Sequence, residues 1–204
     1  MARLVLSLLG PFQASLDGQP VKGFESSKVR ALLALLASEP DRAYPRDTLA
    51  GLLWPDYPNR SALNNLRSAL ANLRQAIDDP HADPPFLLID RSTVQFNRAS
   101  ASVVDVTALH SLAAQPVGQL EEAVSAYRGE FMEGFSLPDS APFEEWLLVR
   151  REQYRRQMLE ALRRLGLHYE EAGDAQRALR YTRRRLELEP WDEDAHRQAM
   201  RLLA

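Results

Sequence analysis

The chain contains no cysteine among its 204 residues. A disulfide framework and a zinc site with cysteine ligands are therefore both excluded. The sequence also lacks a long apolar run, because residues 4–9 are too few to span a membrane and lead directly into Gly10-Pro11. We therefore expect a cytoplasmic protein that does not enter a membrane.

Motifs of the common enzyme classes are missing as well. The four histidines are isolated, and the sequence has no HExxH pair, no GxxxxGK[ST] phosphate loop and no GxSxG turn. Adjacent glutamates such as Glu121-Glu122 and Glu144-Glu145 lie in charge-alternating helical contexts, which are typical of solvated surfaces. We expect no catalytic site, no metal site and no cofactor, and hence no enzyme.

One stretch, residues 59–77, contains no acidic side chain at all. Its larger apolar residues recur at steps of three and four, which predicts an amphipathic helix with one face in a core. The opposite face carries small hydrogen-bonding side chains and the flank a row of cations: Ser61, Asn64, Asn65, Ser68, Asn72 and Gln75, with Arg60, Arg67 and Arg74. An ordinary solvated helix carries mixed Glu and Lys, whereas Asn, Gln and Arg bond DNA bases and phosphates. The pattern favours a DNA-recognition helix over a packed helix that happens to be rich in Asn.

Two further helices are predicted upstream of this stretch. A strongly apolar helix is expected at about residues 26–38, and a second at residues 47–54, which Pro55 ends. Leu53 and Trp54 continue the apolar spacing of the second helix, so we expect both in the core. Three helices in this order are the parts of a helix-turn-helix unit, whose last helix lies in the major groove.

Short apolar segments flank the three helices on both sides. Residues 86–89 and 93–96 surround Asp90-Arg91-Ser92 and predict a hairpin, which after a recognition helix is a wing. At the N-terminus, LVLSLLG, FQASLD and PVKG predict a small antiparallel sheet. The first half is therefore predicted to be an α+β winged helix with an N-terminal sheet, three helices and a wing hairpin.

Net charge does not by itself support DNA binding. Residues 1–98 carry 11 Lys/Arg and 10 Asp/Glu, residues 99–204 carry 14 and 18, and the whole chain has a formal charge of −3. DNA binding therefore requires local segregation, with the basic side chains on one surface. The acids that have to face away or contact protein are Asp41, Asp47, Asp56, Asp78 and Asp79.

The second half is predicted to be all helical. Helical apolar spacing covers residues 103–114, 119–128 and 143–165, whereas Gly, Pro, Asp and Ser prevent a continuous helix across residues 129–142. Arginines on the long helix alternate with glutamates at salt-bridging spacings, which favours a solvated face over a second nucleic-acid site.

From Leu162 onward the sequence matches a tetratricopeptide pattern. The matching positions are Leu162, Leu165, Gly166, Tyr169, Ala178 and Pro190. Thr182 stands where a large aromatic is typical, so we expect looser packing there or a contribution from Tyr181. The last helix ends at Ala204 without a polar cap. We therefore expect this chain to be the N-terminal part of a longer regulator.

Four segments follow one another in the order expected for sheet, helices and wing: GPFQASLDGQPV, SSKVRALLALLA, RDTLAGLLWPD and RSALANLR. In this combination the chain resembles the Streptomyces antibiotic regulatory protein (SARP) family of bacterial transcriptional activators. The resemblance covers the whole chain. It implies an OmpR-type winged-helix DNA-binding domain at residues 1–98 and a bacterial transcriptional activator domain with tetratricopeptide-like helices at residues 99–204. It also implies sequence-specific binding to double-stranded promoter DNA and recruitment of RNA polymerase.

The resemblance further implies roles for individual residues. Small polar side chains of the third helix face the groove, its arginines bond phosphate or a base, and the wing and first helix add contacts. The implied DNA-binding set is Lys28, Arg30, Arg60, Asn64, Asn65, Arg67, Ser68, Asn72, Arg74, Arg91 and Thr93. The loop between the second and third helices is implied to touch polymerase through Pro55, Asp56, Tyr57, Pro58 and Asn59.

One departure from the family pattern affects the expected affinity. The chain has Ala71-Asn72-Leu73-Arg74 where many relatives carry Ser-Arg-Leu-Arg, so one cation is missing. With only about three to five phosphates neutralised, one copy should bind modestly, and self-association on repeated half-sites would strengthen binding. The alternative is a protein-interaction scaffold whose winged helix does not bind DNA. The acid-free face, which lacks aromatic or Met anchors, favours DNA.

Overall fold

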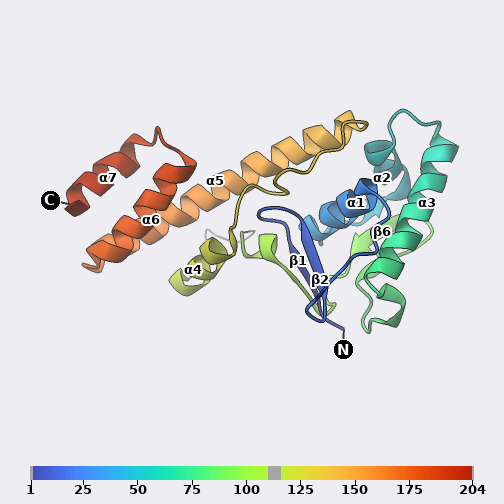
Figure 1. Ribbon diagram of the computed structural model, residues 1–204, viewed down its shortest axis with the longest axis horizontal. Helices are drawn as coiled ribbons and strands as arrows, with labels where there is room; N and C mark the ends of the chain where they lie inside the picture. Colours follow the sequence, from blue (N-terminus) through green and yellow to red (C-terminus); the bar gives the residue numbers. More distant parts are fainter. Residues whose placement is uncertain (1, 110–115, 204) are drawn as a thin grey trace.

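The computed structural model describes residues 2–109 and 116–203 of the chain. A compact α+β unit lies at one end, and a long helix, α5, runs from it toward two shorter helices at the other end (Figure 1). The predicted α+β winged helix followed by a tetratricopeptide-like helical domain is confirmed.

The N-terminal sheet has the strand order β3-β2-β1-β7. β1 (Leu4–Ser7) pairs antiparallel with β2 (Gln13–Leu16), and β2 pairs with the short β3 (Gln19–Pro20). Asp17 and Gly18 form the connecting turn with positive φ angles, which their small or absent side chains tolerate. β7 (Ser102–Val104) then adds parallel to β1.

The helix predicted at residues 103–114 is wrong for its described part. Val103 and Val104 pair with β1, and a 3-10 turn, η2 (Asp105–Leu109), follows. The Asp105 carboxylate accepts hydrogen bonds from the backbone N–H groups of Leu8 and Leu9. These bonds extend the contact between the two segments beyond the pairing of β1 with β7. Burial raises the pKa of Asp105 against the effect of these bonds. Residues 110–114 of the predicted helix lie outside the described residues.

The three helices and the wing occur as predicted. α1 (Ser27–Ser38), α2 (Arg46–Leu53) and α3 (Asn59–Ala76) are followed by a 3-10 turn, η1 (Asp79–His81). The wing strands β5 (Leu87–Ile89) and β6 (Thr93–Phe96) form a three-stranded sheet with β4 (Tyr44–Pro45), in the order β4-β6-β5.

The second half contains α4 (Val117–Ala126), α5 (Ala141–Glu171), α6 (Ala175–Leu188) and α7 (Glu193–Leu203). α5, α6 and α7 pack as successive antiparallel helices (Figure 1). Gly166 allows the close approach, because a Cβ atom there would lie 3.3 Å from the Thr182 and Gln198 side chains. α5 is longer than the predicted residues 143–165, and residues 129–140 are non-helical as expected.

The Thr182 position is not loosely packed. Its hydroxyl is buried, donates to the Ala178 carbonyl oxygen and bonds the Gln198 side chain at 3.1 Å. The neighbouring Tyr181 stacks on Tyr169 at 5.8 Å between ring centroids.

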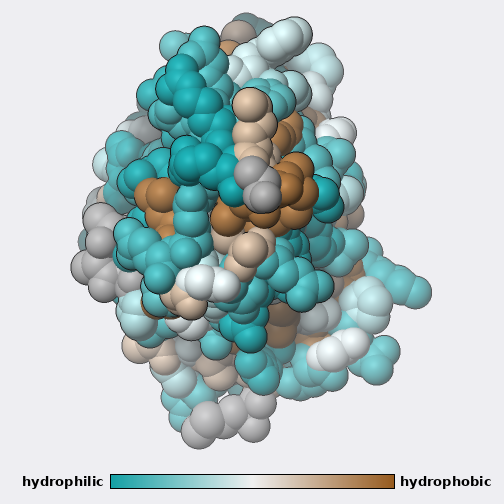
Figure 2. Space-filling view, turned by 90° about the vertical axis from the view of Figure 1, so that its left-hand side faces the viewer, coloured by the Kyte–Doolittle hydropathy of each residue, from teal (hydrophilic) through white to brown (hydrophobic). Residues whose placement is uncertain are grey.

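At the end of the molecule formed by the C-terminal helices, Figure 2 shows apolar surface among mainly hydrophilic residues. Large apolar side chains exposed on α7 are Met200 and Leu203.

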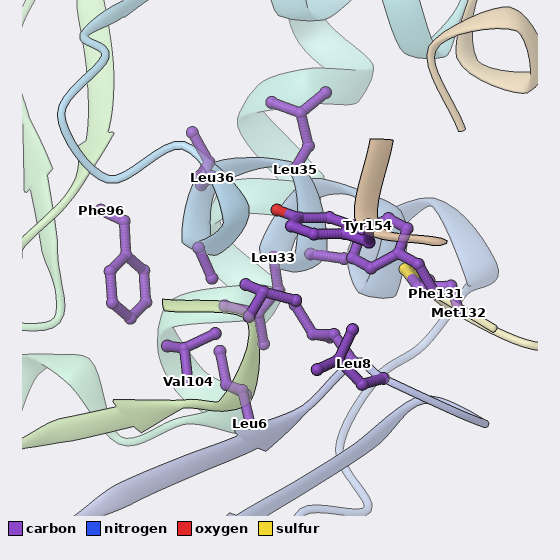
Figure 3. Packing of buried hydrophobic residues seen from close by; sticks show 14 of the residues in the cluster. Leu6, Leu8, Leu33, Leu35, Leu36, Phe96, Val104, Phe131, Met132 and Tyr154 are labelled. Atoms are coloured by element: carbon purple, nitrogen blue, oxygen red, sulfur yellow. The ribbon is translucent and has the colours of Figure 1, made fainter. Parts of the chain in front are cut away.

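One continuous core joins the two halves. Side chains from the N-terminal strand, α1, the wing, β7, the loop before α5 and α5 itself meet in Figure 3, among them Leu6, Leu8, Leu33, Leu35, Leu36, Phe96, Val104, Phe131, Met132 and Tyr154. The Ser140 hydroxyl at the start of α5 donates to the Leu52 carbonyl oxygen at the end of α2. α5 is thus packed directly on the winged helix.

Glu39, at the end of α1, is the polar centre of this contact. Its Oε1 accepts hydrogen bonds from Trp146 Nε1 at 3.1 Å and Arg150 Nη2 at 2.6 Å, both on α5. Burial opposes ionisation of Glu39, but the hydrogen bonds from Tyr44, Trp146 and Arg150 outweigh it and hold its pKa below the usual value.

Substitution of Trp54 tests whether its side chain belongs to the core of the helix-turn-helix, as the sequence predicts. Trp54 is 8% exposed and Leu53 is fully buried, as predicted, whereas Trp191 is 86% exposed. Trp54→Ala should lower the free energy of unfolding by about 3 to 5 kcal/mol, because it removes a large buried side chain. Trp191→Ala, the matched control, should change it by less than about 0.5 kcal/mol. Urea unfolding curves measure both, and equal effects would contradict the assignment.

Glu39 gives the contact between the halves a pH dependence. Because its folded pKa is lowered, the stabilisation is present above the unfolded pKa and is lost as the pH falls through the folded pKa. At pH 7, Glu39→Gln should lower the free energy of unfolding by about 1.5 to 3 kcal/mol. The gap to the parent should close once the pH falls below the folded pKa, which lies below the usual range of a glutamate carboxyl. Glu145→Gln, an exposed change on α5, is the control in the same unfolding titrations, and a pH-independent gap would refute the charge-based cause.

Candidate nucleic-acid interface

The outer face of α3 is polar, cationic and free of acids. Its apolar face is buried through Ala62, Leu66, Ala69, Leu70 and Leu73. Spaced by three and four on the opposite side lie the exposed residues Arg60, Ser61, Asn64, Arg67, Ser68, Ala71, Arg74 and Gln75. The 18-residue helix is thus supported along one side only and presents the other to solvent (Figure 1). A helix presented in this way fits the major groove of DNA.

The side chains on this face are partly engaged with one another. Arg67 Nη1 donates to Asn64 Oδ1 at 3.3 Å, which leaves the Asn64 amide group free to donate. Among the described residues Arg60 has no ion-pair partner, whereas Arg74 Nε donates to Asp79 Oδ2 at 2.9 Å. Ser68 is exposed, and Asn65 is half-buried at the margin of the face.

The prediction that Asn72 lies on the groove-facing side is wrong. Its side chain is buried, its Nδ2 donates to the Gly23 carbonyl oxygen at 2.9 Å, and its Oδ1 accepts from the Glu25 backbone N–H at 3.1 Å. Both functional groups of the amide are therefore used to hold the segment before α1 against α3. Helical periodicity places Asn72 near the polar face but cannot show that this distant segment covers it.

Lys28 and Arg30 also lie elsewhere than the prediction implies. Lys28 Nζ is 2.7 Å from Asp139, its side chain is 13% exposed, and it lies 5.3 Å from the Trp54 ring centroid. Arg30 donates to Ser27 Oγ at 3.0 Å and lies over the Phe135 ring. Both cations are used in the contact between α1 and the chain leading into α5.

The wing turn is closed by hydrogen bonds to Asp90 and presents one exposed cation. The Asp90 carboxylate accepts hydrogen bonds from the backbone N–H groups of Thr93 and Ser92 and from both hydroxyls, which hold its pKa far below the usual range. Arg46, at the start of α2, donates through Nε and Nη2 to the Asp90 carbonyl oxygen at 3.2 and 2.9 Å. Arg91 is exposed at the tip, whereas the Thr93 hydroxyl is occupied within the turn.

Sequence reasoning missed the roles of Asp90 and Arg46. The Asp-x-Ser-Thr pattern is a recognisable signal for a side-chain-capped turn. No comparable signal links Arg46 to a turn 44 residues away.

Most acids of the first half are occupied. Asp41 pairs with Arg98 at 3.1 Å, Asp47 accepts from Asn59 Nδ2 at 3.2 Å, and Asp78 bonds His81 at 2.6 Å. Asp79 is buried beneath Arg74, and Asp56 is exposed in the loop between α2 and α3. That loop, residues 55–59, is exposed throughout. Asp41 and Asp79 thus pair with arginines while Asp56 stays exposed, so the charge segregation that DNA binding requires rests mainly on the absence of acids from α3 itself.

Within residues 2–109 and 116–203, no group of three or more His, Asp or Glu is placed to hold a metal ion. In the same described part of the chain, no helix has the length and apolar character needed to cross a membrane.

Known proteins resemble the chain in both halves. The family model of the bacterial transcriptional activator domain matches residues 93–204, and that of the C-terminal domain of transcriptional regulatory proteins matches residues 24–93. The transcriptional regulatory protein EmbR of Mycobacterium tuberculosis and of Mycobacterium bovis is 36% identical over 86 residues, which is 42% of this chain and 22% of EmbR.

A solved structure extends the likeness to almost the whole chain. Mycobacterium tuberculosis EmbR in complex with a low affinity phosphopeptide matches with a TM-score of 0.68 over 99% of this chain, at 23% sequence identity. The match covers 55% of that chain, so the present chain spans about half the length of the solved relative. The chain belongs to the bacterial transcriptional activator domain family and, with its OmpR-like winged helix, has the domain arrangement of SARP-type transcription regulators.

Proposed function

We propose that the winged helix binds double-stranded promoter DNA in a sequence-specific manner, with α3 in the major groove. The observation that carries this proposal is the exposed face of α3, which combines three arginines with small polar side chains and contains no acid. Amide and hydroxyl groups bond base edges, and arginines bond guanine or phosphate.

Within this proposal the exposed side chains have distinct roles. Asn64 and Ser68 contact base edges, with Asn65 at the margin, and Arg60, Arg67 and Arg74 contact phosphates or flanking bases. Arg91, at the tip of the wing, contacts the adjacent backbone or minor groove. Asn72, Lys28, Arg30 and Thr93 support the fold instead, because each makes a hydrogen bond or an ion pair within the protein.

Activation is proposed to follow from contact between the loop at residues 55–59 and RNA polymerase. The loop is exposed beside the start of α3, and Tyr57 is its large exposed apolar side chain. Four exposed arginines give one copy of the domain a modest phosphate contact, and each neutralised phosphate adds about 0.9 to the magnitude of the salt slope. Two copies on promoter repeats would raise the affinity and the specificity.

Asn64 and Asn72 offer a matched test on one helix. Asn64→Ala should change the preference at one base pair by about 1 to 3 kcal/mol and leave stability unaltered. Asn72→Ala should leave the preference unchanged and lower the free energy of unfolding by about 1 to 3 kcal/mol, because Gly23 and Glu25 lose their partner. Arg67→Ala should weaken binding to all duplexes and lower the salt slope by about one, whereas the exposed Arg156→Ala on α5 should not.

Mobility shifts with promoter fragments and random duplexes at several salt concentrations measure these effects, and urea unfolding measures stability. If the parent bound neither duplex, the DNA-binding proposal would fail and the protein-interaction scaffold would take its place. If Asn64→Ala left base preference as unchanged as Asn72→Ala should, α3 would be the wrong reading element.

Tyr57 tests the polymerase contact separately from DNA binding. Tyr57→Ala should leave promoter affinity within about twofold but reduce activated transcription by roughly fivefold or more, as expected for an exposed aromatic anchor. Purified polymerase, promoter DNA and the parent or variant protein suffice for the measurement. Leu148→Ala, an exposed apolar change on α5, is the control. Unaltered activation by Tyr57→Ala would exclude Tyr57 as an anchor.

A further inference from the structure

A buried carboxylate lies directly beneath the last exposed arginine of α3. Asp79 is 1% exposed, and its Oδ2 accepts a hydrogen bond from Arg74 Nε at 2.9 Å. Its Oδ1 accepts a second bond, also 2.9 Å, from the backbone N–H of Leu87, the first residue of β5. One carboxylate therefore joins the C-terminal turn of α3 to the base of the wing.

The way Arg74 is held leaves its outer edge available. A guanidinium has five N–H donors in a fixed plane, and the Asp79 bond uses the one on Nε. The Arg74 side chain remains 45% exposed, so its Nη groups can meet a phosphate while Nε stays bound. Arg60 and Arg67 have no such support, because among the described residues neither pairs with a carboxylate.

We propose that Asp79 is a positioning residue for DNA binding. It fixes the plane of the Arg74 guanidinium so that the Nη groups face the DNA backbone, and it ties that orientation to the wing. A side chain already held in its binding geometry loses less conformational entropy on binding than a free one. The inference rests on the proposed DNA-binding function and assigns an acid, which itself repels phosphate, a supporting role in it.

Asp79→Asn tests this role with little change in volume. The amide keeps an acceptor for the Leu87 N–H but has no charge to hold Arg74. Binding to specific and random duplexes should weaken roughly threefold to tenfold at about 0.1 M salt, and the salt slope should fall by up to about one. Asp78→Asn is the matched control, because Asp78 is the adjacent acid, bonds His81 and, among the described residues, forms no ion pair with Arg74. It should change binding by less than twofold.

The same change in an Arg74→Gln background separates positioning from folding. If Asp79 acts through Arg74, Asp79→Asn should cause no further loss of DNA affinity once Arg74 is replaced. An equal loss in both backgrounds, or an unchanged salt slope when Arg74 is present, would overturn the proposal. Thermal melts and exchange of the Leu87 amide show whether each variant remains folded at the temperature of the binding assay.

A measurement without DNA completes the test. The Nε–H resonance of Arg74 should be protected from exchange in the parent and in Asp78→Asn, and should lose protection in Asp79→Asn. A parent that binds DNA with an unprotected Arg74 Nε–H would overturn the positioning role alone. A parent that binds no duplex would overturn the proposed function and this role together.

Discussion

The burial of α1 organises the winged helix and the contact that α5 makes with it. Residues 31–37 are all 0% exposed, and a helix that is apolar on all sides has to be covered on all sides. α2 and α3 cover it within the helix-turn-helix, β6 and the N-terminal strand cover it from the sheets, and the chain before α5 and α5 itself complete the enclosure (Figure 3). α3 and α5 therefore share one support.

The packing of the fold also determines which ionisable side chains remain exposed. A chain with a formal charge of −3 can still offer a cationic face, because α3 itself carries no acid. Asp79 and Asp90 are turned inward or into turns, where their oxygens accept N–H groups. Lys28 and Arg30 are likewise used inside the fold. The exposed charge of this domain is thus a small selected subset of its ionisable groups.

Strong local patterns predicted most of the fold, and contacts between distant segments account for the failures. The apolar spacing of residues 59–77, the hairpin around Asp90 and the Gly166 and Tyr169 positions all depend on neighbours within one or two elements. By contrast, residues 103–109 contain a strand only because β1 offers them an edge. Asn72 is buried because residues 23–25 cross over it. Helical position indicates a face, but not what covers that face.

The length of α5 determines how far apart the two ends of the molecule lie. At 31 residues and 1.5 Å per residue it extends about 46 Å, which exceeds the 34 to 36 Å of one turn of duplex DNA. It is a single helix fixed to the winged helix at its first turns, so no flexible linker separates the two ends (Figure 1). Because α5 is one continuous helix, its length sets the distance between the winged helix and the C-terminal end of the molecule. A partner that touches both the winged helix and α7 has to match this distance.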